Sequence, residues 1–204
     1  MGIEAGALAG LQGLQVLDLS NNQLPGIPSS ALRGVAGALV QLLMSGNRIH
    51  SLTVDALEGL GSLKHLDLSG NSITHISHGA FSTLGAMEVF KVHRNSLKAL
   101  PEGAFDAFSQ VSQVLLYDNR WECDCHLAWL WQWMNVTDPS VWDTPGYPLL
   151  CDGPALHSGS PLASLPLPQL ACEVQMKSSD ALVQVGGSLP VWPIYFLFES
   201  LNEK

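Results

Sequence analysis

The 204-residue sequence predicts an α/β solenoid, in which stacked coils each contribute one short strand to a parallel sheet and a cysteine-rich cap closes the C-terminal end. Three observations support this fold class. A leucine pattern recurs every 24 or 25 residues, each unit carries an asparagine at the same place, and the four cysteines and all six tryptophans follow the last unit.

The repeated unit follows the pattern L-x-x-L-x-L-x-x-N-x-L. Four full units begin at Leu14, Leu39, Leu63 and Met87, and a half unit begins at Val111. Because side chains alternate across a strand, the two apolar residues of each L-x-L, such as Leu66 and Leu68, point into the core, and the residue between them faces solvent. One such strand per coil builds a parallel sheet, and a second apolar set in each unit covers the other side of the core.

This pattern is identified as the leucine-rich repeat, and the chain resembles proteins of that family. The resemblance implies a horseshoe whose concave side is the parallel sheet. It also implies that the asparagine of each repeat is buried and hydrogen-bonds the backbone of neighbouring coils, which satisfies groups that would otherwise be orphaned. This asparagine ladder consists of Asn22, Asn47, Asn71, Asn95 and Asn119.

The segment NRWECDCHLAWLWQWM, at residues 119–134, resembles the C-terminal cap of extracellular leucine-rich-repeat proteins. Apolar side chains recur in it at helical spacing, at Leu127, Leu130, Trp131 and Met134, and they predict a helix that covers the last open coil. Asp124 is placed to cap the start of that helix.

The four cysteines allow three pairings. A bond between Cys123 and Cys125 would close a very tight ring, which disfavours one pairing and leaves two open. The resemblance implies Cys123 with Cys151 and Cys125 with Cys172. A zinc site would need two close ligand pairs, whereas Cys151 and Cys172 are far apart in sequence, so we expect disulfides and no metal.

We expect four parts in the chain. Residues 1–13 are the tail of a truncated preceding repeat, 14–119 hold four full repeats and one half repeat, 120–172 form the cap, and 173–204 are a C-terminal extension of unknown structure. The missing first half of the leading repeat suggests a fragment of a longer secreted protein. Its uncapped first coil would allow self-association.

Several function classes find little support in the composition and motifs. The net charge of −9 repels nucleic acid and anionic lipid, and no apolar run is long enough to insert in a membrane. No signal peptide is visible at the N-terminus. His75 and His78 form an H-x-x-H, but we place them in a descending loop without nearby carboxylates or thiols. We therefore expect no cofactor, no metal and no catalytic residue, and hence no enzyme.

The concave face offers the best candidate for a binding site. Small residues dominate its outward columns in the first three coils, whereas basic and aromatic side chains gather in the fourth and fifth. This set consists of Lys91, His93, Arg94, Tyr117 and Asp118. Such residues are typical of protein-binding hot spots, and the alternative is an ordinary solvated strand face.

Paired cysteines and the glycosylation sequon at Asn135 indicate an extracellular, secreted glycoprotein. The repeats resemble secreted plasma proteins of the leucine-rich alpha-2-glycoprotein type, which implies binding of an extracellular protein ligand or receptor and modulation of transforming-growth-factor-beta-type signalling. The cap also resembles that of the non-catalytic subunit of carboxypeptidase N. That resemblance implies a scaffold that stabilises a plasma peptidase, and a third alternative is the ectodomain of a cell-surface adhesion receptor.

Overall fold

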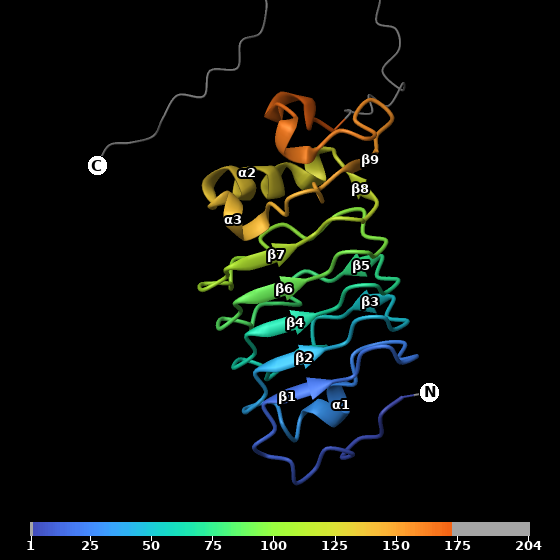
Figure 1. The fold of residues 1–204 in the computed structure, drawn as a ribbon, viewed down its shortest axis with the longest axis vertical. Helices are drawn as coiled ribbons and strands as arrows, with labels where there is room; N and C mark the ends of the chain where they lie inside the picture. The colour runs from blue at the N-terminus through green and yellow to red at the C-terminus, as the bar shows by residue number, and fades with distance from the viewer. Residues whose placement is uncertain (1, 173–204) are drawn as a thin grey trace, which may run out of the picture. The chain divides into compact units, whose positions relative to one another are not determined.

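A computed structural model describes residues 2–172. Five short strands form the main sheet, and all neighbours in it are parallel (Figure 1). In sheet order they are β1 (Val16–Asp18), β2 (Gln41–Leu43), β4 (His65–Asp67), β6 (Val89–Lys91) and β7 (Gln113–Leu115). One strand comes from each coil, so the predicted solenoid with a parallel sheet is confirmed. The predicted extension, 173–204, lies outside the described residues.

The core lies behind this sheet, where the inward side chains of successive coils stack in register. Leu42, Leu66 and Phe90 occupy equivalent positions and are almost completely buried. Leu17 of the first strand is only half-buried. Burial therefore depends on a coil at each side, as expected for a stack in which no coil covers its own apolar face.

The opposite side of each coil is built mainly from turns. It also holds the short helix α1 (Ser29–Leu32) and a second parallel pair of strands, β3 (Ser51–Leu52) with β5 (His75–Ile76). His75 thus belongs to a strand, which corrects its expected place in a loop. Four phenylalanines, Phe81, Phe90, Phe105 and Phe108, fill the last coils in mostly edge-to-face contacts with ring centroids 5.0 to 6.1 Å apart.

The asparagine ladder joins each coil to the one before it. Asn95 accepts a hydrogen bond from the Ile73 backbone N–H at 2.9 Å and donates to the carbonyls of Leu68 and Val92 at 3.0 and 2.9 Å. Equivalent bonds surround Asn47, Asn71 and Asn119. Asn22 differs because it is exposed and bonds only carbonyls of its own turn.

Trp121 continues this ladder into the cap. Within the ladder, one carbonyl per coil accepts from the asparagine of its own coil and from that of the next, as Leu68 does from Asn71 and Asn95. The equivalent carbonyl of the last coil, Leu116, accepts from Asn119 and from the indole Nε1–H of Trp121 at 3.0 Å. The buried tryptophan therefore supplies the donor that a further repeat would have supplied.

The cap lies over the last coil (Figure 1). Its elements are β8 (Trp121–Glu122), η1 (Cys125–Leu127), α2 (Ala128–Val136), α3 (Pro139–Trp142), β9 (Cys151–Gly153), η2 (Leu162–Ser164) and η3 (Leu167–Gln169). Leu127, Leu130 and Met134 are buried as predicted, whereas Trp131 is only half-buried. Trp129 and Trp133 pack against Phe105, which seals the repeat core.

Local hydrogen bonds start the cap helix, and two disulfides close the cap. The Asp124 carboxylate accepts the backbone N–H of His126 at 2.9 Å, so it caps the η1 turn that leads directly into α2. Cys123 is bonded to Cys151 and Cys125 to Cys172, with Cα atoms 5.6 and 5.0 Å apart. This is the pairing that the family resemblance implies. None of the helices within 2–172 is long and apolar enough to cross a membrane.

Candidate functional site

The sheet register aligns outward side chains from all five coils in columns. One column consists of Asp18, Leu43, Asp67, Lys91 and Leu115. Backbone hydrogen bonds continue the same register past the strand ends, as the Arg94 N–H donates to Tyr117 and the Gly70 N–H to His93. The next column is therefore Ser20, Ser45, Ser69, His93 and Tyr117, as the repeat pattern predicts.

An aromatic ladder rises from this column toward the cap. The His93 and Tyr117 rings stack with centroids 4.4 Å apart, and the Tyr117 and Tyr147 rings follow at 4.8 Å. Tyr147 comes from the loop after α3 and is 49% exposed. The sequence did not single out Tyr147, because no periodicity connects the cap loop to the repeats. Its contribution extends the predicted cluster with a second tyrosine.

His93 is a titratable group of this face with a shifted pKa. Burial lowers the pKa of His93, and the positive charges of Arg94 and Lys91 lower it further, while Asp67 and Asp118 act in the opposite direction. Its ring is therefore neutral at physiological pH. The Nδ1 atom is buried and has no hydrogen-bond partner among the described residues.

Beside the stacked rings of His93 and Tyr117, two charged side chains occupy backbone positions that favour glycine. The residue that follows the second column has a positive φ in every coil, with values of +66° at Gly46 and +62° at Gly70. Arg94 and Asp118 hold the same place with φ of +56° and +52°. A non-glycine residue in this left-handed region costs on the order of 1 kcal/mol, less for Asp than for Arg.

Arg94 and Asp118 also form an ion pair. The Arg94 Nε and the Asp118 Oδ2 lie 3.5 Å apart, and both side chains are more than half exposed. A solvent-exposed pair of this kind contributes little to stability because water and salt screen it. The pair therefore does not offset the backbone cost, and its side chains remain accessible to a partner.

A second charged group lies nearer the start of β4 and β6. Lys64 donates to Glu88 at 2.6 Å, and His65 approaches the same carboxylate at 3.8 Å. The Lys64 hydrogen bond lowers the pKa of the Glu88 carboxyl. The Glu88 carboxylate is therefore paired with the positive charge of Lys64. The stacked aromatic rings lie apart from this ion pair, on the fourth and fifth coils and the cap loop.

The remaining predicted site residue, Asn135, lies in the last turn of α2. It is exposed, and its side-chain amide donates to the Trp131 carbonyl at 2.9 Å. Val136, the middle residue of the sequon, is 86% exposed. An oligosaccharide attached at Asn135 would therefore project into solvent.

Comparison with known proteins identifies the class of protein that this fold and surface define. The family model described as Leucine rich repeat matches residues 2–49, 38–97 and 62–120, and the chain belongs to that family. Among curated proteins, the chain is similar to carboxypeptidase N subunit 2 of Homo sapiens, with 33% identity over 69 residues, and to that of Mus musculus, with 34% identity over 69 residues. Each match covers 34% of this chain and 12% of the relative. The resemblance to carboxypeptidase N is thus confirmed, and that to leucine-rich alpha-2-glycoprotein stays a prediction.

Proposed function

We propose that this protein is a secreted leucine-rich-repeat glycoprotein that binds a protein ligand and does not itself catalyse a reaction. The contact surface is the concave patch, which we define as Lys91, His93, Arg94, Tyr117 and Asp118 together with Tyr147. Leucine-rich repeats usually mediate protein interactions, and the fold by itself does not select the ligand. The choice of surface therefore depends on particular side chains.

The observation that carries this proposal is the backbone conformation at Arg94 and Asp118. Glycine would adopt these positive φ values at no steric cost, as Gly46 and Gly70 do in the preceding coils. Here two charged side chains stand in their place without an internal contact that repays the cost. Unfavourable backbone conformations of this kind cluster at binding sites, where the side chain serves a purpose other than stability.

The neighbouring aromatic groups fit the same role. Tyrosine and arginine are enriched among the residues that dominate protein–protein binding energy. Tyr117 is held between His93 and Tyr147, so little conformational entropy is lost when it contacts a partner. Preordering of the central ring supports the concave patch as a hot spot rather than an ordinary solvated strand face.

An extracellular location is supported by the cap. Disulfides persist in oxidising compartments, and all four cysteines of the chain are paired. The exposed sequon at Asn135 suits the addition of an oligosaccharide in the secretory pathway. Mass spectrometry of the protein secreted from mammalian cells, with and without enzymatic deglycosylation, tests occupancy, and an unmodified Asn135 would remove the glycoprotein assignment.

We propose that binding at this patch modulates transforming-growth-factor-beta-type signalling, on the resemblance of the repeats to leucine-rich alpha-2-glycoprotein, and a growth factor of that type is the first ligand to test. Biolayer interferometry with the immobilised chain tests this pairing directly. The triple variant Lys91→Ala, Arg94→Gly, Tyr117→Ala should weaken binding by about thirtyfold or more. Arg33→Ala with Arg48→Ala is the matched control, because both arginines are exposed outside the concave patch. Equal affinity of the triple variant and the wild type would refute the proposed surface.

A second candidate function is favoured by the similarity to carboxypeptidase N subunit 2. In this alternative the solenoid is a scaffold or regulatory subunit that stabilises a plasma peptidase. Co-expression with the catalytic subunit of carboxypeptidase N should then give a complex on size-exclusion chromatography and raise the melting temperature of the peptidase. Separate elution with an unchanged melting temperature would exclude this role. A transmembrane segment in the full transcript would instead favour the ectodomain of an adhesion receptor.

A further inference from the structure

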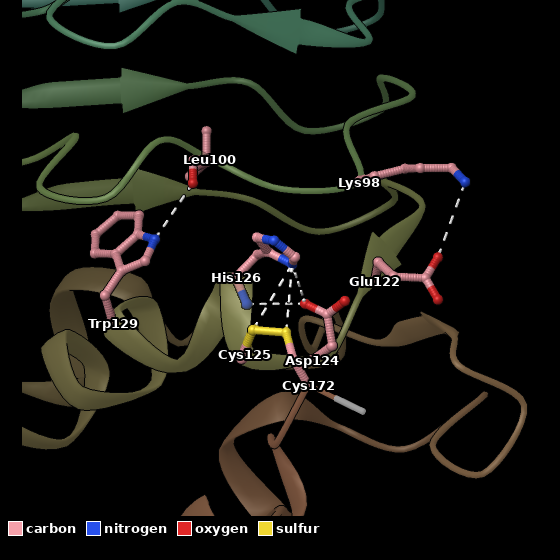
Figure 2. Close-up of polar contacts among 8 residues, drawn as sticks. All are labelled: Lys98, Leu100, Glu122, Asp124, Cys125, His126, Trp129 and Cys172. Carbon is pink, nitrogen blue, oxygen red and sulfur yellow. Dashed lines mark hydrogen bonds and ion pairs between the residues drawn. A yellow bond between two sulfur atoms is a disulfide. The ribbon is translucent and has the colours of Figure 1, made fainter. Parts of the chain in front are cut away.

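Four potential metal ligands gather where the cap helix begins, away from the concave patch. One donor atom each from Asp124, Cys125, His126 and Cys172 lies within 4.8 Å of all the others. The His126 Nδ1 lies 4.0 Å from the Cys125 sulfur and 3.9 Å from the Cys172 sulfur, and 2.9 Å from the Asp124 Oδ1. Figure 2 shows the imidazole above the disulfide with the carboxylate beside it.

These separations approach the edges of a tetrahedral zinc site. Bond lengths of about 2.3 Å to sulfur and about 2.0–2.2 Å to nitrogen and oxygen give nitrogen–sulfur edges of about 3.6 Å and a nitrogen–oxygen edge of about 3.4 Å. The imidazole would need to move by only a few tenths of an ångström. The covalent bond between the two sulfurs must open to an edge of about 3.8 Å, and the Asp124 oxygen, which lies within 4.8 Å of both sulfurs, must approach them to about 3.6 Å.

The two disulfides differ in how easily a reductant can reach them. Cys123 and Cys151 are 0% and 3% exposed, whereas Cys125 is exposed and Cys172 is not buried. Cys125 and His126 also line an open groove of about 550 Å³ between the cap helix and the turns of the last repeats. Reductant and metal ion can therefore approach the outer bond, while the inner bond stays protected and holds the cap in place.

We propose that Asp124, Cys125, His126 and Cys172 bind Zn²⁺ after a thiol reductant has opened the Cys125–Cys172 disulfide. Two reductant thiols are oxidised to one disulfide, and their two electrons convert the protein disulfide to two cysteine thiols. Zn²⁺ binds both sulfurs as thiolates, so two protons are released, and it also takes the His126 Nδ1 and an Asp124 oxygen. Coordination then replaces the covalent link between Cys172 and the start of α2.

The site could not be recognised from the sequence. Three of its residues are adjacent, but the fourth, Cys172, lies 46 positions beyond His126. The fold brings Cys172 to Cys125 rather than to Cys151, which is the pair on which the expectation of no zinc rested. The ligand set of two thiolates, one imidazole and one carboxylate suits zinc better than the hard oxygen-preferring cations. This inference does not depend on the proposed binding function of the concave patch.

The test uses the full chain, partially reduced with a phosphine under native conditions and desalted without oxygen. Peptide mapping should find free thiols at Cys125 and Cys172 and an intact Cys123–Cys151 bond. Titration with Co²⁺ as a spectroscopic probe should give one ion per chain, thiolate charge-transfer bands and tetrahedral visible bands. Zn²⁺ should displace these bands, and competition with a chromogenic chelator then measures zinc affinity.

Three variants separate coordination from structural effects. His126→Ala should lower zinc affinity by roughly tenfold or more. Asp124→Asn should also lower it while it preserves the N-cap, because asparagine caps helices as well as aspartate does. His78→Ala removes another histidine of the same groove and should leave affinity unchanged. Absence of thiolate bands, equal affinity in His126→Ala and wild type, or simultaneous opening of both disulfides would each overturn the proposal.

Discussion

Replacement of Asn95 by alanine tests the claim that buried asparagines hold the coils together. Asn95 is 9% exposed and accepts from the Ile73 N–H, which belongs to the preceding coil. Without the amide, that buried donor has no partner, at a cost of about 1–3 kcal/mol. The bonds to the Leu68 and Val92 carbonyls are also lost, at about 1 kcal/mol each, although Asn71 and Asn119 still serve those carbonyls.

The expected loss in the free energy of unfolding is therefore about 3 kcal/mol, or a decrease of roughly 10 °C in melting temperature. Urea denaturation followed by tryptophan fluorescence, with the disulfides intact, measures it. Asn22→Ala is the matched control, because Asn22 is exposed and makes only two bonds within its own turn. It should lose less than about 1 kcal/mol. Equal losses in the two variants would refute the reasoning that coil-to-coil bonds, rather than local turns, give the ladder its energy.

Three further results are expected. Arg94→Gly should raise the free energy of unfolding by about 1 kcal/mol, because glycine adopts the positive φ without strain and the substitution removes only an exposed ion pair. A loss of stability in urea denaturation would contradict this expectation. Trp121→Phe keeps an aromatic ring in the core but removes the donor to the Leu116 carbonyl and part of the buried indole, so it should cost about 2 kcal/mol or more in the same assay. An unchanged midpoint would argue against a continued ladder. Burial places the pKa of folded His93 below the ordinary 6.5, so the native state binds a proton less readily than the unfolded state. The free energy of unfolding should therefore be unaffected by His93 above pH 6.5 and decrease as the pH falls from 6.5 toward the folded pKa. His93→Gln should remove this part of the pH dependence, and NMR titration of the imidazole should give the lower pKa directly.

Most of the fold could be predicted because each coil repeats the same chemistry. The strand leucines, the asparagine of every turn and the outward columns follow from one period. The place of Cys172 beside Cys125 was available only through resemblance to known caps. Within the cap, the buried helical face at Leu127, Leu130 and Met134 could also be predicted, because its apolar residues recur at helical spacing.

The proposed concave patch could be predicted only in part, because some of its properties are not periodic. Tyr147 reaches Tyr117 through a cap loop whose course depends on tertiary packing. The strain at Arg94 had a signal in the sequence, since Gly46 and Gly70 occupy the same column, but the positive φ itself required the structure. The proximity of His126 to both sulfurs of a disulfide also depends on a contact across the cap.

The central claim is that the repeat stack is sealed by a disulfide-bonded cap that forms in an oxidising compartment. Its most direct test is disulfide mapping of the chain recovered from the medium of mammalian cells that express it. Non-reducing digestion and mass spectrometry should identify peptides that join Cys123 to Cys151 and Cys125 to Cys172, with no free thiol. Recovery of Cys123 joined to Cys172 would contradict the cap geometry, and recovery of all four cysteines as free thiols would contradict both the cap geometry and the extracellular assignment.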